Sequence, residues 1–245
     1  MRYIHHALIL GLLTAFVSSS SLAAQTAPTP TLDQILQKYI DGVGGRAALG
    51  KIRTITAKGT IAISPVGLDG TVEISQKSPN KAVTRVDLGQ GGVQREGFDG
   101  TVGWASDPAT GEIREKTGAD LVEARRGAAF PRELQMKTIY PSMTVKGREK
   151  VGARDAFLIE AVPAGGKPIQ LFFDAETGLL IRQSLTREAG GVVNTYYENY
   201  KPVDGVQRAY TIRQVNDQFT ATITITSITQ NVTLDDALFA KPKGA

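Results

Sequence analysis

Short segments in which apolar and polar residues alternate fill most of the chain after Ile52. Successive side chains of a β-strand point to opposite faces, so an alternation with period two predicts strands that bury one face. Clusters of Gly, Pro, Asn and Asp between these segments predict turns. In the first half of the chain, the predicted strands are residues 52–63, 70–76, 82–88, 93–98 and 101–106.

A second block of alternating segments runs from about Thr144 to Thr229. It contains the clearest predicted hairpin, "PIQLFFDAETGLLIRQSL" (168–185), which turns at residues 175–178. Its last predicted strand, "TATITITSIT" (220–229), alternates apolar residues with threonine. Because short hairpins join antiparallel neighbours, we expect a single domain with one long antiparallel sheet of about twelve strands.

One amphipathic helix is predicted before the strands. Thr31 and Gln34 fit a capping box at its start, and Gly42 and Gly44-Gly45 can end it. Residues 46–49 can add one more helical turn. The apolar stripe of this helix has the spacing of a single helical face and consists of Leu32, Ile35, Leu36, Tyr39 and Ile40.

The insert 117–140 separates the two blocks of strands. Thr117 with Asp120 offers an N-cap for a helix that reaches Ala129, and Pro131 interrupts the helical pattern. A second short helix is predicted over 132–140. Because a long antiparallel sheet has one apolar face to cover, we expect the first helix and this insert to cover that face.

Residues 1–24 have the pattern of a secretory signal peptide. Arg2 is followed by a short apolar stretch and then by small residues, and we expect cleavage after Ala23 or Ala24; an uncleaved anchor is the alternative. Residue 25 is glutamine and the chain has no cysteine, which excludes both a lipid anchor on cysteine and disulfides. We therefore expect a periplasmic product with a flexible leader (25–30) and a single domain (31–245).

Both histidines of the chain lie within the predicted signal peptide. The predicted mature chain then lacks histidine and cysteine, which excludes Ser-His and Cys-His nucleophilic sites and imidazole or thiolate metal sites. Carboxylate-only and Ser-Lys schemes remain possible in principle, but no spacing favours them. We expect no catalytic residue, no metal and no cofactor. The charges are interspersed along the chain, which argues against a nucleic-acid partner.

Trp104 is the only tryptophan of the chain. Asp99-Gly100 suits a two-residue hairpin turn, and this register places Arg95 opposite Trp104, with Val102 on the same face. In one interpretation the indole belongs to the core and Arg95 covers its ring. In the other, the indole lines a mostly apolar cavity between the curved sheet and its helical lid.

Four segments together resemble the periplasmic lipoprotein carriers of the LolA/LolB-like family. The segment "EGFDGTVGWASDPATGEI" (96–113) resembles the DG-x-x-x-W-x-x-DP hairpin of that family. The other similar segments are "IDGVGGRAALGKIRTITAKGTI" (40–61), "LFFDAETGLLIRQ" (171–183) and "YENYKPVDGVQRAYTIR" (197–213). The resemblance covers most of the mature chain.

The resemblance implies an α+β fold: an open, curved antiparallel half-barrel of about 11 or 12 strands, with helices covering its concave face. It also implies an apolar cavity that takes acyl chains. It implies a carrier of lipids or lipoproteins in outer-membrane lipoprotein sorting, and Gln25 in place of cysteine places this chain with the soluble members. We expect a monomer without enzymatic activity. An inner-membrane donor and an outer-membrane acceptor are then possible partners. We expect the ligand-binding residues among the apolar positions of strands and lid: Val102, Trp104, Ile113, Leu134, Met136, Ile139, Phe157, Ile159, Leu171, Phe173 and Ile223.

Two other readings remain open. The same scaffold could be a non-catalytic structural or protein-interaction module of the cell envelope. In that case we expect a filled interior and an exposed apolar patch, whereas a carrier requires a void under residues 117–140. A carboxylate-dependent hydrolase is the third alternative.

Overall fold

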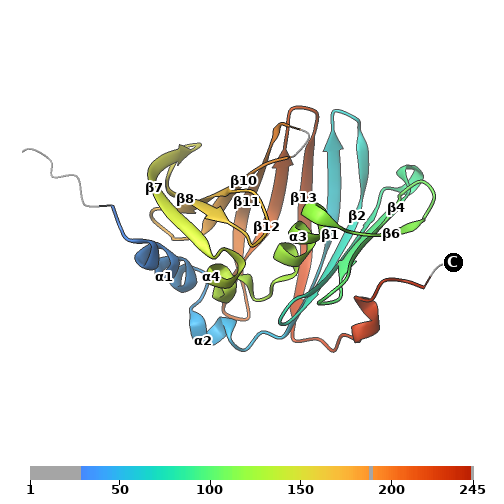
Figure 1. Ribbon diagram of the computed structural model, residues 1–245, viewed down its shortest axis with the longest axis horizontal. Coiled ribbons are helices and arrows are strands. Elements are labelled where there is room, and N and C mark those ends of the chain that lie inside the picture. The colour runs from blue at the N-terminus through green and yellow to red at the C-terminus, as the bar shows by residue number, and fades with distance from the viewer. Residues whose placement is uncertain (1–28, 188–189, 244–245) are drawn as a thin grey trace, which may run out of the picture.

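The computed structural model describes residues 29–187 and 190–243 (Figure 1). The predicted signal peptide and most of the predicted leader lie outside the described residues. Among the described helices, none has the length and apolar character needed to cross a membrane.

One antiparallel sheet organises the fold (Figure 1). Its strands follow each other as β6-β5-β4-β3-β2-β1-β13-β12-β11-β10-β9-β8-β7, so the pairing of β1 with β13 joins the two blocks. The order does not close on itself, which makes the sheet an open half-barrel. The bounds are β1 (Thr54–Ser64), β2 (Leu68–Lys77), β3 (Lys81–Asp87), β4 (Val93–Phe98), β5 (Gly103–Ser106), β6 (Ile113–Glu115), β7 (Ser142–Val151), β8 (Arg154–Val162), β9 (Ile169–Asp174), β10 (Leu180–Thr186), β11 (Val192–Val203), β12 (Val206–Val215) and β13 (Thr220–Gln230).

The sheet confirms the predicted fold class. β4 has the predicted bounds, β9 and β10 form the predicted hairpin, and β13 corresponds to the predicted last strand. The sheet has 13 strands, slightly more than expected. The three-residue strand β6 is too short for an alternation to reveal it. A short 3-10 helix, η1 (Gly89–Gly91), connects β3 to β4.

Helix α1 (Leu32–Gly42) begins with the predicted capping box between Thr31 and Gln34. Helix α2 (Arg46–Leu49) is the predicted extra turn. Gly42 sits against the backbone of Thr177 in the turn between β9 and β10, where a Cβ atom would have no room. Because of this close approach, the apolar stripe of α1 packs against the strands of the second block.

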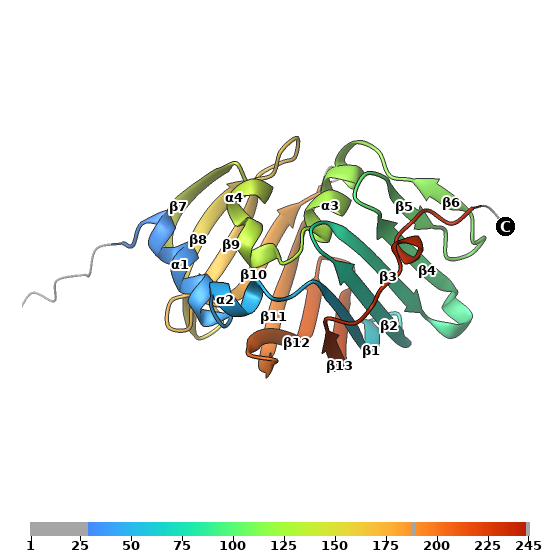
Figure 2. The same cartoon turned by 90° about the horizontal axis from the view of Figure 1, so that it is seen from below.

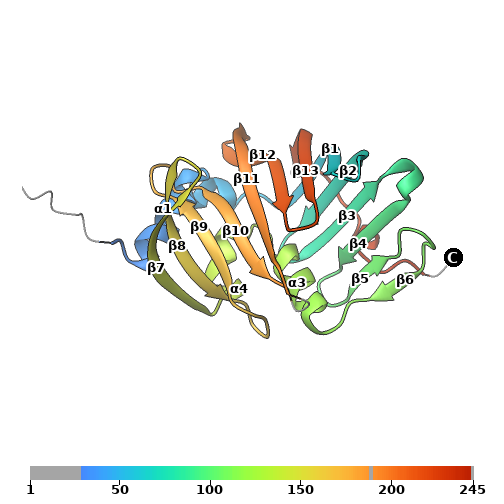
Figure 3. The ribbon, with the colours of Figure 1, turned by 90° about the horizontal axis from the view of Figure 1, so that it is seen from above.

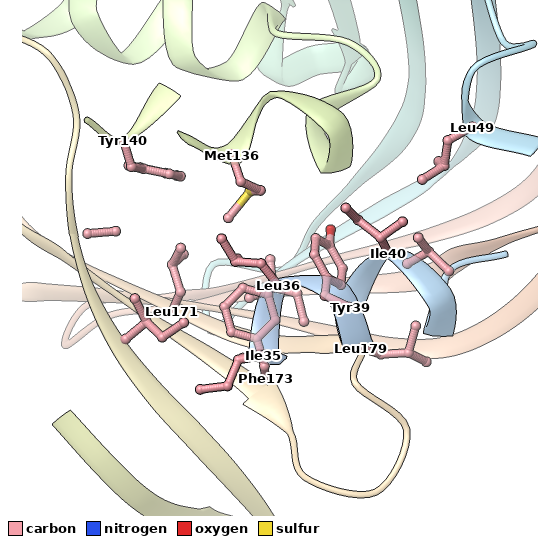
Figure 4. Close-up of a cluster of buried hydrophobic side chains, with 14 of the residues drawn as sticks. Ile35, Leu36, Tyr39, Ile40, Leu49, Met136, Tyr140, Leu171, Phe173 and Leu179 are labelled. Carbon is pink, nitrogen blue, oxygen red and sulfur yellow. The ribbon is translucent and has the colours of Figure 1, made fainter. Parts of the chain in front are cut away.

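The main hydrophobic cluster lies between α1 and the strands β8, β9 and β10 (Figure 4). Tyr39 packs on Phe173 with ring centroids 5.0 Å apart. Met136 and Tyr140 reach the same cluster from the insert. Figure 4 labels Ile35, Leu36, Tyr39, Ile40, Leu49, Met136, Tyr140, Leu171, Phe173 and Leu179 of this cluster.

The insert between the blocks is helical, as predicted. It contains α3 (Gly118–Ala128), the 3-10 helix η2 (Arg132–Gln135) and α4 (Met136–Ile139). Thr117 occupies the N-cap position of α3, but its side chain makes no capping hydrogen bond, contrary to the expected role of Thr117 with Asp120. Figures 2 and 3 show α3 and α4 on the same side of the sheet as α1.

The predicted register of the Trp104 hairpin is wrong. Gly97, not Arg95, lies opposite Trp104, because the two turn residues are Gly100 and Thr101. Asp99 donates its backbone N–H to the carbonyl of Val102 and therefore still belongs to the ladder. Its carboxylate also accepts hydrogen bonds from the backbone N–H groups of Thr101 and Val102, which moves the turn one residue along the chain.

Trp104 lies in a small cluster of its own. Its side chain is fully buried, and its Nε1 donates a hydrogen bond of 2.9 Å to the carbonyl of Phe239. Gly103 faces α3, so the next side chain along β5 points to the opposite face of the sheet. Phe239 follows the 3-10 helix η3 (Asp236–Leu238). The C-terminal segment that contains η3 runs past β1, β2 and β3 (Figure 2).

Candidate functional site

A cavity of about 430 Å³ lies between α3 and the concave face of the sheet. Its wall combines apolar residues with polar residues, because the strands beneath α3 carry both kinds on their inward face. The lining residues are Ile74, Gln76, Ala82, Val83, Thr84, Glu96, Gly97, Phe98, Lys116, Glu123, Ala124, Arg126, Gly127, Ala128, Arg132, Gln183, Thr195, Tyr197, Ile212 and Gln214.

A second cavity of about 210 Å³ adjoins the first. Both are lined by Ile74, Gln76, Arg132, Tyr197 and Ile212, so they meet at these residues. The wall of the second cavity is predominantly apolar and is made by α1, η2 and the strands β1, β2, β10, β11, β12 and β13. Its remaining lining residues are Tyr39, Val43, Ile55, Ala57, Glu133, Leu180, Tyr200, Gln207, Arg208, Ala209, Ile225 and Ile228.

A hydrogen-bonded group ties the insert to strand β10 beside the first cavity. Arg132 Nη2 donates to the hydroxyl of Tyr140 over 2.9 Å and to Gln183 Oε1 over 3.2 Å. Arg126 Nη1 donates to the same amide oxygen over 3.1 Å and to the same hydroxyl over 3.4 Å. Two guanidinium groups from the insert therefore share two neutral acceptors.

The arginines lower the pKa of the Tyr140 hydroxyl. Burial alone would raise this pKa, but the charges of Arg132 and Arg126, and the hydrogen bonds that they donate, outweigh burial. By contrast, the pKa of the Tyr39 hydroxyl lies well above its usual value, chiefly because the side chain is buried.

The carboxylates that line the two cavities are all engaged in ion pairs. Glu133 Oε1 lies 3.0 Å from Arg208 Nη1, and Glu96 Oε2 lies 2.6 Å from Lys116 Nζ. Glu123 pairs with Arg126 within α3. Across residues 29–187 and 190–243, no group of three or more His, Cys, Asp or Glu side chains is placed to hold a metal ion.

None of the residues predicted to bind a ligand lines these two cavities, and their contact with a ligand stays a prediction. Trp104 and Ile113 belong to the cluster around Phe239. Val102 precedes β5, and Ile223 lies half-buried on β13. The main cluster takes up Leu134, Met136, Ile139, Phe157, Ile159, Leu171 and Phe173.

The polar residues of the site were not among those predicted. Gln183 is separated by 57 positions from Arg126 and by 51 from Arg132, so local periodicity cannot bring them together. The available signal was that charged residues at 126, 132 and 133 interrupt the apolar pattern of a segment predicted to cover an apolar face.

No family model and no curated protein sequence matches the chain. Solved structures do match it. A LolA superfamily protein from Nitrosomonas europaea aligns with a TM-score of 0.62 at 13% identity, over 87% of this chain and 99% of that chain. The chain has a LolA-like fold.

Two further structures agree with this LolA-like fold. A DUF1329 family protein from Desulfovibrio piger has a TM-score of 0.63 at 13% identity, over 86% of this chain and 98% of that chain. The domain of a putative outer membrane lipoprotein-sorting protein from Vibrio parahaemolyticus has a TM-score of 0.61 at 15% identity, over 85% and 95% of the two chains. At these identities the comparisons establish the fold alone.

Proposed function

We propose that this LolA-like chain is a soluble periplasmic carrier that binds acyl chains of lipids or lipoproteins in the two adjoining cavities. The observation that carries the proposal is the cavity of about 430 Å³ between α3 and the sheet. Its size falls in the range of small-molecule sites, which is roughly 300–1,000 Å³. The outer-membrane lipoprotein-sorting domain with the same fold is consistent with such a cargo.

Burial of methylene groups can supply the affinity without any catalytic group. Each buried CH₂ contributes roughly 0.8 kcal/mol, so an acyl chain of about ten buried carbons contributes on the order of 8 kcal/mol before the entropy cost of binding. The apolar wall of the second cavity, which includes Ile55, Ile225 and Ile228, offers the surface for this burial. We propose a monomer without enzymatic activity that receives cargo from an inner-membrane donor and delivers it to an outer-membrane acceptor.

The void under the insert favours this function over the alternative of an interaction module. A closed module requires a packed interior in that place, whereas residues of α3 and η2 line a void. The two readings also differ in what the purified protein retains. A carrier co-purifies with lipid, and a module with a packed interior does not.

The test starts from the full chain expressed with its predicted signal peptide. Protein from the osmotic-shock fluid is expected to begin at Ala24 or Gln25 and to show bound lipid in native mass spectrometry. Precursor mass in the membrane fraction would contradict the proposed location. Absence of lipid, together with no binding of added dodecanoate in calorimetry, would contradict the proposed cargo.

A matched pair of variants on β1 locates the binding. Ala57 is buried and lines the second cavity, whereas Ala62 is exposed on the same strand. Ala57→Phe is expected to fill the cavity and to weaken dodecanoate binding at least tenfold, and Ala62→Phe is expected to leave it unchanged. Thermal unfolding of both variants separates loss of the cavity from loss of the fold.

A further inference from the structure

We propose that the acyl ligand carries an anionic group, a carboxylate or a phosphate, which binds the guanidinium of Arg132 where the two cavities meet. This inference rests on the proposed function and names its ligand class. It comes from the charged side chains that line the cavities, among which the positive ones outnumber the negative ones.

Every carboxylate that lines the cavities already has a cationic partner. The ion pairs are Glu96 with Lys116, Glu123 with Arg126, and Glu133 with Arg208. Arg132 is the remaining charged lining residue, and among the described residues it has no carboxylate partner within ion-pair distance. The lining of the two cavities therefore has one uncompensated positive charge.

The hydrogen bonds that Arg132 donates go to neutral groups. Its Nη2 reaches only the hydroxyl of Tyr140 and the amide oxygen of Gln183, and its buried Nε has no hydrogen-bond partner in the described part of the chain. A guanidinium presents five N–H donors and favours planar, bidentate anions. Taking a charge out of water without a counter-ion is costly, so an incoming anion at this place regains a large part of that cost.

The position of Arg132 fits an amphiphile better than a free anion. Arg132 lines both cavities, and the walls of the smaller one continue from it over Val43, Ile55, Ile225 and Ile228. An anionic group held at Arg132 can thus direct its acyl chain along these apolar residues. Arg126 lies close by and shares both neutral acceptors with Arg132, but its charge is offset by the ion pair with Glu123, so Arg132 carries the uncompensated charge.

Four probes with the same dodecyl chain test the proposal by calorimetry, each below its micelle concentration. They are dodecanoate, dodecyl phosphate, the glycerol monoester of dodecanoic acid, and dodecyltrimethylammonium. Inorganic phosphate alone is the fifth titrant. We expect the two anions to bind the wild type roughly 10- to 100-fold more tightly than the neutral ester, as one charge-assisted hydrogen bond implies. The cationic probe and inorganic phosphate are expected to bind more weakly still.

The variant Arg132→Gln removes the charge and is expected to bring the anions to the affinity of the neutral ester. Arg132→Lys keeps the charge and is expected to retain most of the preference. Arg125→Gln is the matched control, because Arg125 is exposed on α3 and lines neither cavity. Thermal unfolding of each ligand-free variant shows whether the fold is intact, and the preference of the wild type tests the proposal even if a variant fails to fold.

Equal binding of anionic and neutral probes to the wild type would overturn this inference and leave the proposed function standing. A preference that survives in Arg132→Gln would also overturn it, since another group then recognises the anion. Binding of no dodecyl probe would overturn the proposed function together with the inference. Tight binding of inorganic phosphate, without any gain from a dodecyl chain, would show an anion site that is not a lipid site.

Discussion

The replacement Trp104→Phe tests how the C-terminal segment is held on the sheet. The indole is fully buried, and its Nε1 donates to the carbonyl of Phe239, whose own side chain is also fully buried. Arg95 approaches the ring to 5.9 Å from its centroid. Phenylalanine keeps part of the apolar volume but has no N–H group, so the carbonyl of Phe239 loses its donor.

The expected loss of stability is about 2–4 kcal/mol. A buried carbonyl without a partner costs about 1–3 kcal/mol, and the smaller ring loses roughly 1 kcal/mol of packing. Urea unfolding followed by far-ultraviolet circular dichroism measures this loss, since Trp104 is the only tryptophan and the tryptophan fluorescence disappears with it. Phe239→Leu is the control, because it keeps the backbone carbonyl and therefore the hydrogen bond; we expect it to cost less than about 1.5 kcal/mol.

Dodecanoate binding decides the role of the indole. Because Trp104 lies outside both cavities, the Trp104→Phe variant is expected to bind dodecanoate as the wild type does, once its fold is confirmed. An unchanged stability combined with a several-fold loss of affinity would refute this reasoning. In that case the indole would contact the ligand, as the cavity interpretation of the sequence predicts.

Two further predictions concern the mobility of the insert and the ion pairs of Asp236. Amide hydrogen exchange in residues 118–140 is expected to be faster than in β9, β10 and β13 and to slow when dodecanoate is added, because lids come from the less stable part of a fold; equal protection with and without ligand would contradict a moving lid. Hydrogen bonds from Lys77 and Lys81 lower the pKa of Asp236 to about 2. The stabilisation from its two ion pairs is therefore complete above the usual carboxyl pKa and is lost as the pH falls through about 2. The fluorescence of Trp104 is expected to change over this interval in the wild type, and an identical change in Asp236→Asn would contradict the assignment to Asp236.

The elements that local chemistry specifies could be predicted from the sequence. The capping box of α1 needs only Thr31 and Gln34, which are three residues apart, and the structure contains both of its hydrogen bonds. The hairpin of β9 and β10 turns where Asp174 accepts hydrogen bonds from the backbone of residues 176 and 177. Such signals lie within a few positions of one another, so no tertiary contact is required to recognise them.

The Trp104 hairpin shows where this local reasoning fails. Asp99-Gly100 fits a two-residue turn by composition, but the carboxylate of Asp99 caps the backbone of the next residues and moves the turn to Gly100 and Thr101. The move shifts the pairing by two positions and places Gly97 under the indole, where a glycine leaves the space that the ring occupies. The partner of the indole, Phe239, is 135 positions away, beyond the reach of any pattern in the hairpin.

The position of the cavities follows from how apolar residues are distributed over the sheet. The prediction that ligand-binding residues are the large apolar ones overlooks this distribution. Large inward residues such as Phe157, Leu171 and Phe173 are those that α1 can cover completely, so the most apolar strands form a filled core. The inward face of the neighbouring strands carries shorter or polar residues, among them Thr84, Thr195 and Gln214, and α3 spans this region without filling it. In a half-barrel with helices on one side, the void is therefore expected over the less apolar strands. An acyl chain placed there has polar groups within reach, which is the condition that an anionic end group at Arg132 requires.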